Sequence, residues 1–236
     1  MILKSLDQND AIQAHRAALH LEALIPFIRS DVVVDLIGVS NVFCHLVVAA
    51  SAFLSTPIIA ALIEIAERDV MLVLLRNQGL HLPGWLISKM LDRFADDDDI
   101  LLACESRDDL DHEAVLVIFD CRLRWIEKNS PCFHGLTVCD HGESLIVIAL
   151  WASPADLRER YCKALSQSGR ITSALLLFSF AIGARDVALH LFAHAADVKI
   201  AVMDDAIKMR YAGSIRLFAQ KAQICLLYTS PSPRDQ

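Results

Sequence analysis

Apolar residues recur at helical spacing in several stretches of the chain. One stripe consists of Ile58, Ile59, Leu62, Ile63 and Ala66, and a second consists of Leu86, Ile87, Met90, Leu91 and Phe94. Charged and polar residues occupy the opposite faces of both segments. An apolar stripe with this period predicts an amphipathic helix that buries one side.

The segments that join these helices also recur along the chain. Phe53, Leu80 and Leu110 lie 27 and 30 residues apart, a spacing that indicates a weak internal repeat. Each follows an apolar segment and precedes a helix-start signal such as Thr56-Pro57. Two helices with one apolar face each cannot bury both faces alone, so neighbouring pairs must stack. We therefore expect an all-α fold: a HEAT-like helical-repeat solenoid with a C-terminal helical module.

The composition along the chain predicts four segments. We expect N-terminal helical repeats over 1–130, an irregular loop over 131–142, and a C-terminal helical module over 143–224. Residues 225–236 change composition abruptly and resemble translated library-adaptor sequence, so they are excluded from fold reasoning. The whole chain of 236 residues holds 8 Gly and 7 Pro, and this scarcity of turn residues favours long helices.

The charge balance limits the classes of partner. Lys and Arg number 22 against 29 Asp and Glu, a formal net charge of −7. This sign argues against nucleic acid as a partner, because a phosphate backbone is bound by clustered basic residues. Seven cysteines without a disulfide-scaffold spacing, and a start without an apolar signal segment, predict a cytoplasmic protein.

A membrane-associated helical protein is one alternative. The run from Leu36 to Ile63 contains no Asp, Glu, Lys or Arg, which a hydropathy scan would mark as a candidate span. Thr56-Pro57 interrupts the run with a helix start, and its flanks are acidic rather than basic. We therefore expect a pair of buried core helices and no membrane partner.

A zinc-binding module or metal-assisted enzyme is the second alternative. Its candidate ligands are Cys132, His134, Cys139 and His141, which place two thiols and two imidazoles within one loop. The single-residue gaps within both pairs differ from the wider gaps of zinc knuckles, so we expect no metal and no cofactor. The i,i+4 pair His190 and His194 lacks the Glu of a zincin helix, and it is expected to lie on a packed helix.

Two parts of the chain resemble a bacterial all-helical family catalogued as domain of unknown function 2336. The first part combines Asp69–Gly79 with Asp98–Leu110, and the second combines Leu175–Asp186 with Tyr211–Ala219. The resemblance covers about residues 31–224. It implies α-helical repeats, and it implies neither an assigned activity nor site residues.

The leading functional hypothesis is a non-enzymatic scaffold or regulatory module that binds a partner protein. Solenoids expose long surfaces suited to protein partners, whereas nucleophile-elbow and phosphate-loop glycine patterns are absent from this sequence. Candidate contact residues lie at the expected edges between repeats, namely Arg76, Lys89, Arg93 and Arg107.

Overall fold

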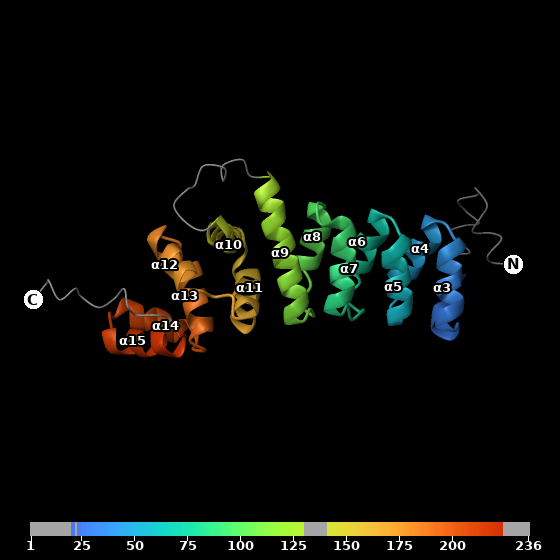
Figure 1. Ribbon diagram of the computed structural model, residues 1–236. Helices are drawn as coiled ribbons and strands as arrows, with labels where there is room; N and C mark the ends of the chain where they lie inside the picture. The colour runs from blue at the N-terminus through green and yellow to red at the C-terminus, as the bar shows by residue number, and fades with distance from the viewer. Residues whose placement is uncertain (1–19, 22, 130–140, 224–236) are drawn as a thin grey trace, which may run out of the picture. The chain divides into compact units, whose positions relative to one another are not determined.

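The computed structural model describes residues 20–21, 23–129 and 141–223, and every regular element within these ranges is a helix (Figure 1). The predicted all-α class is therefore confirmed. The chain divides into two compact units, residues 1–121 and 122–236, and the division falls within α9 (His112–Asn129). Residues 131–140 of the predicted irregular loop lie outside the described residues, and α10 begins at His141.

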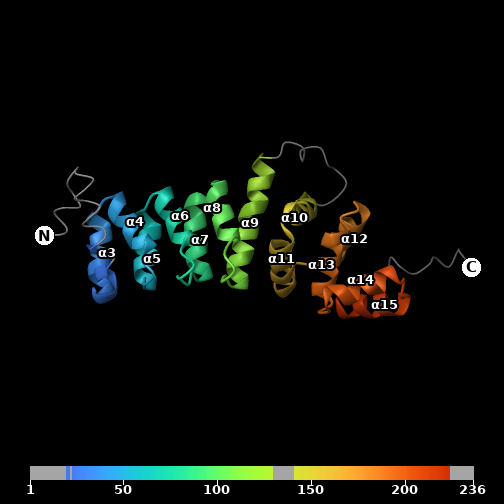
Figure 2. The same cartoon turned by 180° about the vertical axis from the view of Figure 1, so that it is seen from behind.

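Unit 1 is built from two layers of stacked helices. One layer contains α3 (Ser30–Val39), α5 (Thr56–Ile65) and α7 (Gly84–Phe94), and the other contains α4 (Val42–Ala50), α6 (Arg68–Arg76) and α8 (Asp98–Glu105). Each helix packs against the second helix after it, α3 on α5 and α4 on α6, and so on through α7 and α8 (Figure 2). This packing is consistent with a helical-repeat solenoid.

Short-range signals account for where these helices begin. The side chain of Asn41 accepts a hydrogen bond from the backbone N–H of Cys44 at 3.2 Å, at the start of α4. Asp97 accepts one from Ile100 N–H at 3.2 Å, at the start of α8. Pro57 lies in the first turn of α5, where its missing N–H leaves no helical bond unmade. These caps satisfy donors that a helix start otherwise leaves without partners.

The core of unit 1 follows the predicted apolar stripes. All five residues of the first stripe are buried, as are the first four of the second, while Phe94 is half-buried. The aligned joint residues differ in burial: Leu80 is 3% exposed, whereas Phe53 is 70% exposed. Burying such side chains contributes about 1.5–3 kcal/mol each, so the stripes rather than Phe53 hold the layers together.

Unit 2 repeats part of this stacking. Its helices are α10 (His141–Ala152), α11 (Ala155–Gln167), α12 (Ser173–Ala181), α13 (Arg185–Ala195), α14 (Ile200–Lys208) and α15 (Ala212–Lys221). α10 packs on α12 and α11 on α13, but α14 packs on α13 and α15. Gly183 has φ 77°, a backbone conformation that suits glycine and turns the chain between α12 and α13.

The long run without charged residues is divided among three helices. Leu36 lies in α3, α4 follows, and Ile63 lies in α5. Among the helices that the structure describes, none has both the length and the hydropathy to cross a bilayer.

Candidate functional site

Arg107 is not on an exposed edge, so the prediction that it lies on a contact surface is wrong. Arg107 is fully buried, with 0% of its surface exposed to solvent. Nη1 donates to the carbonyl oxygens of Leu75 at 2.8 Å and Asn77 at 2.9 Å, and Nη2 donates to that of Leu80. Nε and Nη2 also bind the two carboxylate oxygens of Asp109, at 2.9 and 2.7 Å. The guanidinium thus joins the end of α8 to the loop that follows α6.

Asn77 makes the same kind of link one step earlier in the stack. Its Nδ2 donates to the carbonyl oxygens of Ala49 at 3.2 Å and Ser51 at 2.8 Å, at the end of α4. Its Oδ1 accepts from Gly79 N–H at 3.2 Å. Because Arg107 binds the Asn77 carbonyl in turn, the ends of α4, α6 and α8 are connected by side chains that satisfy terminal carbonyls.

The other basic candidates differ in what they can offer a partner. Arg93 donates to the carbonyl oxygens of Ile63 and, at 3.0 Å, of Ala66, at the end of α5. Lys89 forms an ion pair with Glu64, and this pair lowers the pKa of the carboxyl. Arg76 is exposed and forms no side-chain hydrogen bond or ion pair with any described residue. Of the four predicted contact residues, Arg76 is therefore the one most available to a partner.

The acidic run at the start of α8 has a structural partner. Arg68 Nε lies 2.5 Å from Asp97 Oδ2, and its Nη2 binds Asp99. These bonds raise the pKa of Arg68 and lower that of Asp97. The run therefore both caps α8 and holds it to the start of α6.

The structure does not describe the side chains of the predicted zinc ligands. Cys132, His134 and Cys139 lie outside the described residues, and so does the side chain of His141. Within the described part of the chain, no group of three or more His, Cys, Asp or Glu side chains could hold a metal ion. The zinc hypothesis stays a prediction.

The thiols that the structure describes are poor nucleophiles. Cys44, Cys104, Cys121 and Cys162 are buried and are not disulfide-bonded. Burial raises the pKa of Cys104 and that of Cys162 to about 12 each. Because the thiolate is the reactive form, these side chains act as small apolar residues.

His190 and His194 lie on α13, as predicted for a packed helix. Nδ1 of His190 and Nε2 of His194 are buried without a hydrogen-bond partner among the described residues. Burial lowers both pKa values; Arg158 lowers that of His190 further, and Glu159 acts in the opposite direction on both. The pair therefore favours the neutral imidazoles.

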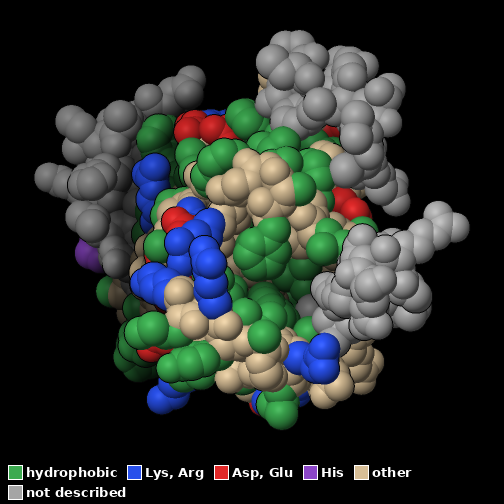
Figure 3. All heavy atoms as spheres, turned by 90° about the vertical axis from the view of Figure 1, so that its left-hand side faces the viewer, with side chains coloured by type: hydrophobic (Ala, Val, Ile, Leu, Met, Phe, Trp, Pro, Cys, Tyr) green, Lys and Arg blue, Asp and Glu red, His purple; other side chains and the backbone are tan. Residues whose placement is uncertain are grey.

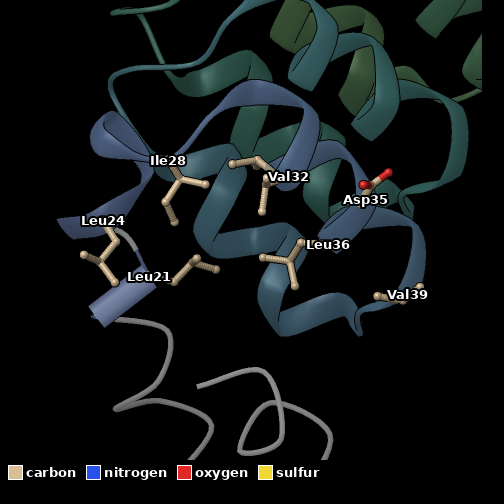
Figure 4. Close-up of a pocket in the computed structure, with 8 residues that line it drawn as sticks. Leu21, Leu24, Ile28, Val32, Asp35, Leu36 and Val39 are labelled. Atoms are coloured by element: carbon tan, nitrogen blue, oxygen red, sulfur yellow. The ribbon is translucent and has the colours of Figure 1, made fainter. Parts of the chain in front are cut away.

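An apolar groove that the sequence did not predict lies beside α3, and we call it the α3 groove. It has a volume of about 360 Å³ and is lined by Leu21, Leu24, Ile28, Val32, Val33, Asp35, Leu36 and Val39 (Figure 4). Val39 is 81% exposed and Val32 52% exposed, so apolar surface faces solvent there. The available signal was the wide apolar face of α3, where valine, leucine and isoleucine cover more of the helix than packing on α5 requires.

The two units carry opposite net charges. Residues 1–121 contain 8 Lys or Arg and 19 Asp or Glu, a formal charge of −11, whereas residues 122–236 contain 14 and 10, a charge of +4. Asp35, on the wall of the α3 groove, is exposed and forms no ion pair with any described residue. A partner that enters the groove therefore meets apolar side chains in an acidic environment.

Comparisons with known proteins add no family to this description. No family model, no curated protein and no solved structure matches the chain. The resemblance to the bacterial all-helical family accordingly stays a prediction, and the α3 groove is the site that the geometry itself brings forward.

Proposed function

We propose that this chain is a non-enzymatic helical-repeat module that binds a partner protein through the α3 groove. The observation that carries the proposal is the exposed apolar surface of Val32 and Val39 beside Asp35. Contiguous apolar surface of this kind is characteristic of protein-interaction sites. Reduced, buried thiols such as Cys104 support a cytoplasmic setting, where thiols are kept reduced.

The groove favours an amphipathic helix as the bound element. Apart from Asp35, its wall along α3 from Val32 to Val39 is apolar, and helices bind such grooves with apolar residues at i, i+3, i+4 and i+7. The net charge of −11 on residues 1–121 favours a helix whose flanks carry Lys or Arg. The proposed partner therefore presents a basic, amphipathic helical segment to the groove.

Selection of peptides from a random display library against the full chain tests this proposal. We expect enriched peptides to show apolar residues at helical spacing with Lys or Arg at the edges. Val39→Lys should weaken their binding at least about tenfold, measured by fluorescence polarisation, because it places a cation in the apolar wall. Leu102→Lys is the matched control, since Leu102 is 51% exposed on α8. Peptides without this pattern, or equal binding to Val39→Lys, would contradict the proposal.

A further inference from the structure

The stacking of helices leaves apolar surface exposed within each of the two units. In unit 1, α3 packs on α5 with one side and lines the α3 groove with the other. In unit 2, the stack that runs from α10 to α12 is not continued by α14, which packs on α13 and α15. Each unit therefore presents the kind of apolar helix face that buries a neighbouring helix elsewhere in its own stack.

The exposed surface in unit 2 is apolar with basic neighbours. We call it the C-terminal surface and define it by Leu177 and Phe180 of α12, Ile182 after it, Val202 of α14, Tyr211 before α15, and Leu217 of α15. These side chains are between 37% and 61% exposed. Figure 3 shows apolar side chains gathered over this part of unit 2, with Lys and Arg side chains beside them.

Charge distinguishes the two surfaces. Arg210 and Arg216 belong to the same segment as the C-terminal surface, are exposed, and form no ion pair with any described residue. The α3 groove carries a charge of the opposite sign: Asp35 lines it and forms no ion pair in the described part of the chain. The units that carry these groups have net charges of +4 and −11. Apolar surfaces with opposite charge attract each other and disfavour pairing with their own kind.

We propose that the α3 groove of one chain binds the C-terminal surface of a second copy, so that the protein self-associates head to tail. The proposal rests on the proposed function, because it identifies a second copy as an occupant of the same groove. In such a complex α3 of one copy covers α12 of the next, where stacking within the chain stops. An interface between two different surfaces is heterologous, and it leaves one surface of each kind open for further copies.

Sedimentation velocity of the full chain tests the proposal. We expect the average mass to rise above that of the 26.2 kDa chain with increasing concentration, and to fall again with added salt, which screens the attraction between the units. Val39→Lys blocks the groove and Leu177→Glu blocks the C-terminal surface. Each variant alone should associate at least about tenfold more weakly than the wild-type chain.

A mixture of the two variants provides the decisive result. Each variant keeps one intact surface, so an equimolar mixture should form a complex of two chains and no larger species. Leu102→Lys should associate like the wild-type chain, because Leu102 has the same exposure as Leu177, 51% against 52%, and belongs to neither surface.

Three results would overturn self-association. The first is a wild-type chain that stays monomeric at all concentrations. If this chain associates only after residues 1–19 are removed, the occupant of the groove is that segment and not a second copy. The second is a mixture that stays monomeric although the wild-type chain associates. The third is unchanged association of both variants. If the chain is monomeric but selected peptides still bind the groove, the self-association proposal fails and the proposed function stands. If the chain is monomeric and no peptide binds the groove, both proposals fail.

Discussion

Replacing Arg107 by Ala should destabilise unit 1 by roughly 3 kcal/mol. The change removes a fully buried guanidinium that donates to the carbonyls of Leu75, Asn77 and Leu80. Leu75 and Leu80 are buried, and each carbonyl left without a donor costs about 1–2 kcal/mol. Asn77 is half-buried and Asp109 is 34% exposed at its side chain, so water replaces those bonds at little cost.

Urea unfolding followed by circular dichroism at 222 nm measures this cost. A loss of about 3 kcal/mol should also lower the melting temperature by roughly 10 °C for a unit of this size. If the two units unfold separately, the transition of unit 1 alone should shift. Arg76→Ala is the control, because Arg76 is exposed and surface changes of this kind usually stay within about 0.5 kcal/mol.

Two further substitutions separate hydrogen bonding from packing. Arg107→Met retains much of the side-chain volume without any donor, so it should be nearly as unstable as Arg107→Ala. Arg107→Lys retains the charge, but one ammonium cannot reproduce the planar fork that reaches three carbonyls and a carboxylate, so it should recover less than half of the loss. The reasoning would be refuted if Arg107→Ala cost less than about 1 kcal/mol or if Arg107→Met restored wild-type stability.

Three other changes probe separate contacts. Gly84→Ala should destabilise the chain by about 1–3 kcal/mol in the same urea assay, since a Cβ would meet Asp111 Oδ1 at 3.0 Å and Ala114 N at 3.1 Å; wild-type stability would show that the contact relaxes freely. Arg93→Ala should cost about 1–2 kcal/mol by removing two bonds to the end of α5, and thermal melting equal to that of the wild-type chain would disprove this. The lowered folded-state pKa values of His190 and His194 predict stability that is fully present above pH 6.5 and is lost as the pH falls below it, because the unfolded chain then binds more protons. A double change of both histidines to Leu should flatten that pH dependence between pH 5 and 7, whereas an unchanged slope would locate the cause elsewhere.

Features that depend on near neighbours could be predicted from the sequence. The apolar stripe through Leu62 and the stripe through Leu86 identified the buried faces of α5 and α7, because helical period alone decides which residues share a side. Pro57 marked the start of α5, and Asp97 caps the start of α8 by an equally local contact. Caps and proline act within a single turn, so residues a few positions apart carry the information.

The roles of the arginines depended on distant parts of the chain. Arg76 ends α6 and Arg107 follows the end of α8, the next helix of the same layer, yet Arg76 is exposed and Arg107 is buried. The carbonyls that hold Arg107 come 27 to 32 residues earlier in the chain. No local sequence pattern distinguishes the two arginines, since either side chain could have been exposed to solvent or buried against the end of another helix.

The α3 groove was also decided by the tertiary structure. Val32 and Val39 are apolar residues of a type usually found in cores, and the wide apolar face of α3 does not by itself tell which of its residues stay at the surface. They are exposed because α5 covers one side of α3 and leaves the groove side open. The sequence determined the all-α class, the helix starts and the apolar faces through short-range physics; tertiary packing decided which of those faces stay open, because that depends on which helices stack upon each other.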